Sequence, residues 1–176
     1  MTLPNPPAED GDRAACRSLD GLAPRFRAQL ARVFTRLEAR TWIPVARETM
    51  RSNARAAFLF GFGRTWDDGR GIVTNAATGE RTWHHYGLAA DLGDRRYDDA
   101  HTPDQFYRDL ADAALAEDLT SGSDWNRNNV HDEHFCDRPH LQWFCEGMHV
   151  SPSALAAELL ASSGLAAVWK ELHADG

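Results

Sequence analysis

Thr82-Trp83-His84-His85-Tyr86-Gly87-Leu88-Ala89-Ala90-Asp91 is the stretch of the chain that constrains the fold most. Its first histidine, His84, and its last residue, Asp91, can both bind a metal ion and stand seven positions apart. On a straight α-helix this spacing separates two side chains by about 10 Å along the axis, at about 1.5 Å per residue. On an unbroken strand the odd offset sends them to opposite faces. The two residues can therefore reach one ion only if the chain bends between them.

Gly87 stands where that bend is needed. Glycine accepts the positive φ angles that other residues avoid, so a tight turn is possible at this position. We predict a loop that carries His84, a turn at Gly87, and a short strand over residues 88–92 that delivers Asp91.

A second cluster, Asp137-Arg138-Pro139-His140, lies far along the chain. Pro139 biases the residue before it toward extended backbone, so the cluster is predicted on a loop that enters a strand. A catalytic zinc site uses three protein ligands and keeps one position open, and His140 can be the third ligand. Asp137 remains beside it. A carboxylate there can accept a proton from an attacking water and return it to the leaving amine, which makes Asp137 a candidate general base.

Apolar periodicity and turn residues predict the remaining elements. They are a helix from Pro24 to about residue 37, a strand over 42–49 with Pro44 near its start or on a sheet edge, a helix over 52–62 capped by Ser52 or Asn53, a short strand over 72–75, a helix begun by Thr102-Pro103-Asp104-Gln105 and running to about 119, a strand over 141–144, a helix capped by Ser151-Pro152 with Leu155 and Leu159 inward and ended by Gly164, and a last helix over 165–172. This order predicts an α+β fold with a small, mainly antiparallel sheet covered by helices.

Length and composition narrow the class of protein. The chain has 176 residues, 43% of them hydrophobic, and lacks an apolar run long enough to span a membrane, so we expect one soluble domain, a monomer by default. A formal charge of −7 provides no basic field for nucleic acid or anionic membranes. Residues 1–17 are rich in Pro, Asp, Glu and Gly and are expected to be a disordered tail before a domain over 18–176.

Taken together, these residues resemble a known family. The pattern is Thr82-x-His84-x-x-Gly87-x-Ala89-x-Asp91 followed by Asp137-x-Pro139-His140, with 19–26, 48–52, 72–76 and 122–125 as supporting segments in the same order. It is similar to the zinc peptidases that include D-alanyl-D-alanine carboxypeptidases and dipeptidases and phage L-alanyl-D-glutamate endopeptidases, of the Hedgehog/DD-peptidase fold. The resemblance spans about residues 18 to 145.

The resemblance implies a role for each site residue. His84, Asp91 and His140 would be the ligands of Zn²⁺, and Asp137 the general base. Arg51 would bind substrate and steady the developing oxyanion. Thr82, which replaces the family's usual serine, and the neighbours His85 and Tyr86 are candidate substrate contacts, although packing in the cleft wall explains His85 and Tyr86 equally well.

The activity that the resemblance implies is hydrolysis of a peptidoglycan stem peptide. An aspartate as the base, where the dipeptidases have a glutamate, favours an L-alanyl-D-glutamate endopeptidase. The alternatives are a D-Ala-D-Ala carboxypeptidase or dipeptidase and a catalytically silent zinc-binding module. The first residues contain no secretory signal, so we expect a cytoplasmic protein that a lysis system releases to the cell wall.

Three cysteines, an odd number without a Cys-x-x-Cys pair, favour reduced thiols over a disulfide framework. Cys136 and Cys145, together with nearby histidines 131, 134, 140 and 149, suggest a second, structural zinc site only weakly, since their spacing matches no common zinc motif. Trp83, Trp125 and Trp143 are expected in the core or the cleft wall.

Overall fold

The computed structural model describes residues 3–130, 136–144 and 151–176. Its centre is one antiparallel sheet in the order β1-β2-β4-β3. The strands are β1 (Pro44–Glu48), β2 (Ala89–Asp94), β3 (Leu119–Ser121) and β4 (His140–Trp143). Neighbouring strands pair antiparallel throughout. The predicted α+β class with a small antiparallel sheet is confirmed.

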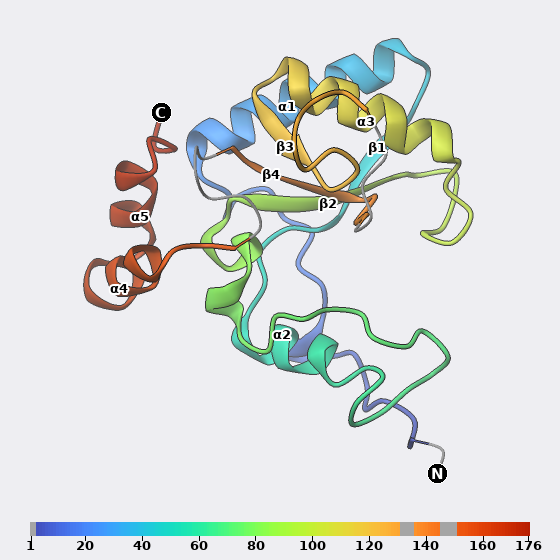
Figure 1. Cartoon of the computed structure of the whole chain (residues 1–176), viewed down its shortest axis with the longest axis vertical. Helices are drawn as coiled ribbons and strands as arrows, with labels where there is room; N and C mark the ends of the chain where they lie inside the picture. Colours follow the sequence, from blue (N-terminus) through green and yellow to red (C-terminus); the bar gives the residue numbers. More distant parts are fainter. Residues whose placement is uncertain (1–2, 131–135, 145–150) are drawn as a thin grey trace.

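Two amphipathic helices, α1 (Pro24–Ala39) and α3 (Asp104–Ala116), lie side by side on one face of the sheet (Figure 1). The inward side chains of α1 follow the helical period, and Phe26, Leu30 and Val33 are fully buried. They meet apolar residues of β2 and of α3 in the main hydrophobic core. This layer leaves the opposite face of the sheet for Asp91 of β2 and for His140 and Gln142 of β4.

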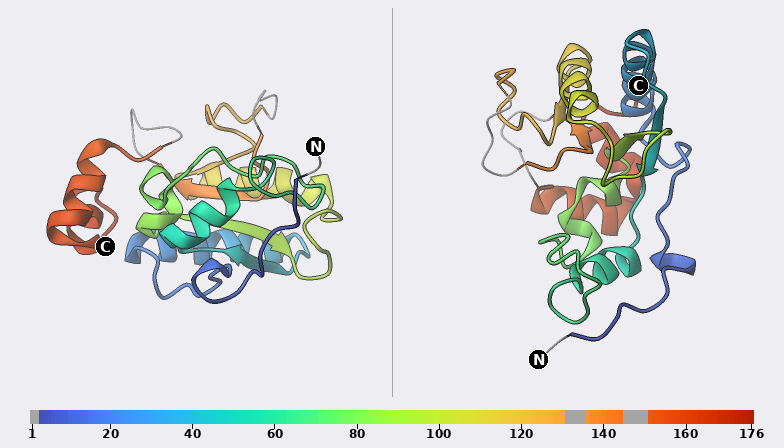
Figure 2. Two further views of the ribbon diagram at one scale, coloured as in Figure 1. Left: turned by 90° about the horizontal axis from the view of Figure 1, so that it is seen from below. Right: turned by 90° about the vertical axis from the view of Figure 1, so that its right-hand side faces the viewer.

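The rest of the chain forms a lower lobe and a terminal pair of helices. The lobe contains α2 (Asn53–Phe60) and the 3₁₀ turns η2 (Gly79–Arg81) and η3 (Trp83–Tyr86), and lies away from the α1 and α3 layer (Figures 1 and 2). The helices α4 (Ala154–Ser163) and α5 (Leu165–Glu171) stand at one end of the sheet. Trp169 Nε1 donates to Tyr86 O at 2.7 Å, which joins α5 to η3.

Several predicted boundaries are wrong. The described residues 72–75 form no strand, and Ile72 is 62% exposed, because that segment follows the surface without a partner strand. Thr102 does not cap α3: Pro103 holds the N-cap position, and the Thr102 hydroxyl donates to Asp98 O instead. The helix ends at Ala116 rather than about residue 119, because Asp118 adopts a positive φ and the chain then enters β3.

The C-terminal helices differ from the prediction in two details. Ser153, rather than Ser151, caps α4 by accepting a hydrogen bond from Ala156 N. Leu155 is 48% exposed, so it does not face inward as its apolar character suggested. Ala156 is the buried residue of α4. As predicted, Ser52 caps the start of α2 and Gly164 ends α4.

The N-terminal segment, for which composition predicts disorder, runs along the lower lobe over its described part, 3–17 (Figure 2). Backbone carbonyls hold it there: Asp12 O accepts from Ser52 Oγ at 2.6 Å, and Cys16 O accepts from Thr49 N at 2.7 Å. A domain boundary at residue 18 stays a prediction. Among the described residues, no helix combines the length and apolar character needed to cross a bilayer.

Asp94 fastens the end of the β1 and β2 pair and provides a test of the fold. Its buried carboxylate accepts from Ile43 N at 2.9 Å and from Arg96 N at 2.8 Å. The hydrogen bond from the Arg96 side chain holds the pKa of Asp94 far below its usual range. Because the folded pKa is depressed, this stabilisation is present above the unfolded pKa and is lost as pH falls toward the folded value.

We therefore expect Asp94→Asn to lower the free energy of unfolding by about 1–2 kcal/mol at pH 7. The difference from the parent protein should shrink as pH falls below about 4, near the unfolded pKa of an aspartate. Urea titrations at several pH values measure both effects. Asp98→Asn, at an exposed position of the same loop, is the control and should change stability little. A difference independent of pH would contradict this role.

Candidate metal and catalytic site

The turn between His84 and Asp91 forms as the sequence predicts. Thr82 caps η3, its hydroxyl accepting from His84 N at 3.4 Å. Gly87 follows at φ 65° and ψ 29°, in the left-handed region, and β2 begins two residues later. A side chain at this position would meet Gly21 O at 2.4 Å, so glycine is required by contact as well as by conformation.

Strand pairing brings the third residue to the same place. Asp91 of β2 lies directly opposite His140 of β4 in the antiparallel register. Side chains of directly opposed residues project from the same face of a sheet, about 5 Å apart at Cβ. His84 then approaches this pair from η3. The structure thus unites the three predicted ligands, which come from three separate elements.

The three ligand atoms form a nearly equilateral triangle. Asp91 Oδ1 lies 3.3 Å from His84 Nε2 and 3.2 Å from His140 Nδ1, and the two nitrogens are 3.3 Å apart. A tetrahedral zinc ion binds such atoms at about 2.0–2.1 Å, which places the ligands about 3.3 Å from one another. The spacing of the three donor atoms therefore fits three positions of a tetrahedral ion.

In His84 and His140, the hydrogen bond at the outer ring nitrogen determines whether the inner nitrogen carries a proton or a lone pair. His84 Nδ1 lies 2.7 Å from Thr49 O, a carbonyl that can only accept, so this nitrogen carries the proton. His140 Nε2 lies 3.0 Å from Gln142 Oε1, also an acceptor. Both inner nitrogens consequently offer lone pairs when the rings are neutral. Two lone pairs and a carboxylate face each other, an arrangement that a cation stabilises.

The electrostatics of the ligands agree with a cation site. Burial would raise the pKa of Asp91, but the neighbouring His84 and His140 outweigh it and hold that pKa well below its usual value. Burial would lower the pKa of His140, yet its hydrogen bond to Asp91 raises it. The carboxylate is therefore ionised, and the cluster attracts positive charge, whether a proton or a metal ion.

Asp137 lies on the loop that leads into β4. Its backbone N–H donates to Gly122 O at 2.9 Å, and its carbonyl accepts from His140 N at 3.0 Å. A Cβ at Gly122 would meet Asp137 O at 2.1 Å, so that glycine permits the close approach. Burial raises the pKa of the Asp137 carboxyl, and the charge of Asp91 adds to this, against the opposing effect of His140. The predicted base is thus held within electrostatic reach of the ligands.

Arg51 follows β1 and lies next to the ligand cluster. Its Nε donates to Glu48 Oε1 at 2.5 Å, and its Nη2 lies 3.5 Å from Asp91 Oδ2. The residue is 9% exposed. It also lines a cavity of about 410 Å³ whose wall includes His85, Leu160 and four residues of the N-terminal segment, namely Gly11, Asp12, Ala14 and Cys16. Arg51 therefore links this cavity to the ligand cluster.

The three candidate substrate contacts differ in access. His85 lines the cavity, and its Nδ1 is 2.9 Å from Arg51 O. Thr82 is buried and is occupied by capping η3. Tyr86 is fully buried, and its hydroxyl donates to Glu80 O at 3.1 Å, which favours the packing alternative for this residue. Substrate contact by His85 and Thr82 stays a prediction.

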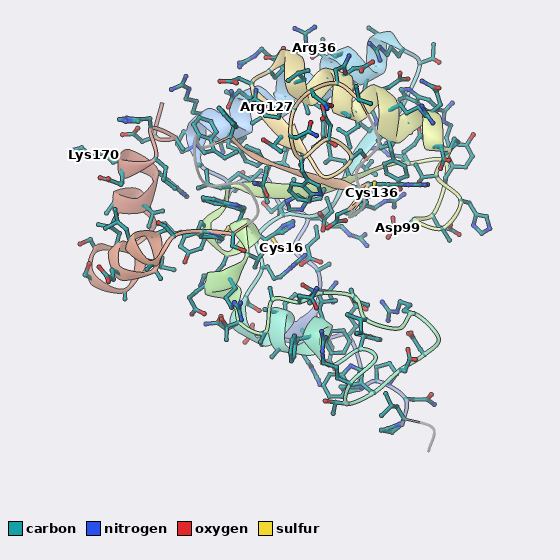
Figure 3. All side chains as sticks on the ribbon, in the orientation of Figure 1. Cys16, Arg36, Asp99, Arg127, Cys136 and Lys170 are labelled. Atoms are coloured by element: carbon teal, nitrogen blue, oxygen red, sulfur yellow. The ribbon has the colours of Figure 1, made fainter. Side chains whose placement is uncertain are left out.

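Other predicted residues have less to do with the ligands. Cys136 is exposed just before Asp137 (Figure 3), whereas Cys145 and the histidines at 131, 134 and 149 lie outside the described residues. Trp83 and Trp143 are buried in the core, and the ring centroid of Trp125 lies 5.5 Å from that of His140. These places agree with the expected positions in the core or the cleft wall.

Sequence reasoning missed the residues that support the ligands. Thr49 acts through its backbone carbonyl, which has no sequence signature. For Gln142, the one clue to its contact with His140 was its position two residues later in the chain. Glu48 is a buried charged residue at the end of a strand. Because most glutamates are exposed, the residue type gives no sign of this burial. These residues hold the ligands and Arg51 in place.

The sequence alone matches no protein-family model and no curated protein. The structure is similar to several solved ones. It matches the LdcB LD-carboxypeptidase with a TM-score of 0.52 and 14% identity, covering 97% of this chain and 75% of that chain. It matches a mutant of the vancomycin resistance D,D-pentapeptidase VanY in complex with Zn(II) with a TM-score of 0.51 and 14% identity, covering 93% of each chain. VanYB in complex with D-alanine-D-alanine gives a TM-score of 0.50 and 15% identity over 100% of this chain and 98% of that one. The predicted fold is thereby confirmed.

Gly87 allows a test of the ligand geometry that removes no ligand. We expect Gly87→Ala to weaken metal binding about tenfold or more, because the left-handed φ and the contact with Gly21 O force the turn to move. Gly71→Ala is the matched control, since Gly71 has φ 69° but no atom within 4 Å of an added Cβ. Competition with a chromogenic chelator measures the affinity. Equal metal affinity in the two variants would show that the turn does not set the site.

Proposed function

We propose that this chain is a zinc-dependent peptidase that hydrolyses the stem peptides of peptidoglycan. The observation that carries the proposal is the triangle of His84 Nε2, Asp91 Oδ1 and His140 Nδ1, whose sides of 3.2–3.3 Å fit a tetrahedral ion. It occurs in a fold shared with a D,D-pentapeptidase in complex with Zn(II). The shared fold and the three candidate ligand atoms are therefore two separate observations that support the same chemistry.

Each residue has a role in the proposed mechanism. His84, Asp91 and His140 would hold the metal, with Thr49 O and Gln142 fixing the two rings so that lone pairs face inward. Zinc, when bound, polarises a peptide carbonyl and lowers the pKa of a water molecule. Asp137 accepts the proton of the attacking water and passes it to the leaving amine. Arg51 opposes the negative charge that develops on the carbonyl oxygen.

The position of Arg51 supports this last role. Its guanidinium contacts the Asp91 ligand at 3.5 Å and also lines the cavity that extends toward Leu160. Among the described residues that line this cavity, Arg51 is the one lysine or arginine, and it also contacts Asp91, so a substrate that fills the cavity would meet its charge. Long-range attraction of an acidic stem peptide is weak for a chain of net charge −7, so a local arginine is the group that favours it.

We further propose cleavage between L-alanine and D-glutamate, supported by an aspartate at the position of the base. A second candidate is removal of a carboxy-terminal D-alanine. It is favoured by the comparison with VanYB, which was solved in complex with D-alanine-D-alanine. In either case the proposed enzyme acts as a monomer and reaches the wall after a lysis system opens the membrane. A silent zinc-binding module is the alternative of another class.

Two substitutions separate metal binding from turnover. We expect His84→Ala to lose both the bound zinc and the lytic activity, because it removes a ligand. Asp137→Asn should keep about one zinc per chain and lose at least about 100-fold in turnover, because it removes only the base. His101→Ala, at an exposed histidine, is the matched control. Elemental analysis and release of wall fragments provide the two measurements. Full lytic activity of His84→Ala would refute the proposal.

The products decide which bond is cut. Mass spectrometry of purified wall peptides after digestion should show new L-alanine carboxyl ends and D-glutamate amino ends. Release of free D-alanine without those ends would replace the endopeptidase with the carboxypeptidase. Zinc binding without cleavage of any wall peptide would support the silent module.

A further inference from the structure

Glu48 holds two arginines from a buried position at the end of β1. Its Oε1 accepts from Arg51 Nε at 2.5 Å, and its Oε2 accepts from Arg55 Nη2 at 3.0 Å and from Arg55 Nε at 3.3 Å. The three residues are between 6% and 9% exposed. A charge this deeply buried needs a partner of opposite sign, and each member of the group supplies one.

Arg55 anchors this group to the N-terminal segment. Its Nη1 donates to Glu9 Oε1 at 2.6 Å and to Arg13 O at 3.0 Å. The same segment accepts hydrogen bonds from Ser52 and Thr49, which stand one residue after and two residues before Arg51 in the chain's turn from β1 into α2. Arg55 therefore contacts Glu48 and the N-terminal segment at the same time.

The contact fixes the direction of the Arg51 guanidinium. A hydrogen bond at Nε sets the plane of the group, because the fork of donors is rigid. In that plane, Nη2 lies 3.5 Å from Asp91 Oδ2, which is longer than a strong charge-assisted hydrogen bond. Among the described residues, Arg51 forms ion pairs with Glu48 and Asp91, so the loss of Glu48 would leave the guanidinium drawn toward Asp91, a proposed metal ligand.

We propose that Glu48 is a positioning residue that sets the direction of Arg51, with Arg55 as its anchor. The effect on catalysis rests on the proposed function, because it requires that Arg51 act on a substrate. The hold of Glu48 on the Arg51 side chain does not depend on any activity. The two parts can therefore be tested separately.

Kinetics test the first part. We expect Glu48→Gln, assayed at saturating zinc on purified stem peptide, to lower kcat/KM by about tenfold to 100-fold, in line with the cost of misplacing a group by about 1 Å. In an Arg51→Ala background, Glu48→Gln should lower kcat/KM by less than about twofold, because the group it positions is gone. Independent, multiplicative losses in the double variant would overturn the proposal.

The chain contains a matched control for burial and charge. Glu117 is a buried carboxylate that also binds two arginines, Arg32 at 2.5 Å and Arg36 at 2.6 Å. Arg36 lies at the α1 and α3 layer, far from the lower lobe (Figure 3). We expect Glu117→Gln to lower Tm and to leave kcat/KM of the folded, zinc-saturated enzyme unchanged within about twofold. If Glu117→Gln lowers kcat/KM as much as Glu48→Gln does, the role of Glu48 is merely structural and the proposal is overturned.

An NMR measurement tests the second part without activity. The Nε–H signal of Arg51 should be protected from exchange in the parent protein and should lose that protection in Glu48→Gln, while the signals of Arg32 and Arg36 stay unchanged. If the parent protein cleaves no wall peptide, the proposed function fails. Exchange of the Arg51 Nε–H then decides by itself whether Glu48 holds the Arg51 side chain. Retained protection of the Arg51 Nε–H in Glu48→Gln would overturn the inference.

Discussion

Two imidazole nitrogens and a carboxylate oxygen face one another at 3.2–3.3 Å, and the outer nitrogen of each ring is already committed to an acceptor. Neutral rings in this arrangement bring lone pairs together, which costs free energy until a cation occupies the centre. The arrangement persists because separate constraints meet there. The register of β2 with β4 sets Asp91 against His140, and the left-handed Gly87 returns the chain so that His84 arrives from the side.

Much of this geometry could be predicted because its causes are local. The spacing of His84 and Asp91 demands a turn, and Gly87 is a residue that permits one. The periodicity of α1 predicts the helix that covers the sheet. The meeting of His140 with Asp91 is different, because 49 positions separate them and a strand register cannot be read from either segment alone. There the resemblance to a known family supplied the pairing, and the structure gives its physical basis.

The parts that sequence could not predict depend on backbone groups and on partners distant in the chain. Thr49 orients His84 through a carbonyl that every residue possesses. β3 has three residues, too few to show an alternating pattern, and its Thr120 and Ser121 are buried polar residues. The N-terminal segment has few apolar groups, so composition predicts disorder. In the described part of this segment, carbonyl acceptors and an ion pair from Glu9 to Arg55 contact the lower lobe, and such contacts leave no trace in composition.

The charges around the ligands explain why a buried glutamate stands beside the arginine. Arg51 carries a positive charge next to Asp91, a proposed metal ligand, and two unit charges about 4 Å apart interact by about 4 kcal/mol at an effective dielectric constant near 20. Unbalanced, that charge would oppose metal binding. Glu48, in direct contact with Arg51, supplies a negative charge of its own and so offsets the repulsion at the metal position. Arg55 and Glu9 then balance Glu48 in turn. A chain of alternating charges thus runs from Glu9 through Arg55, Glu48 and Arg51 to Asp91. In the proposed function, this chain lets Arg51 act on a substrate without opposing the metal.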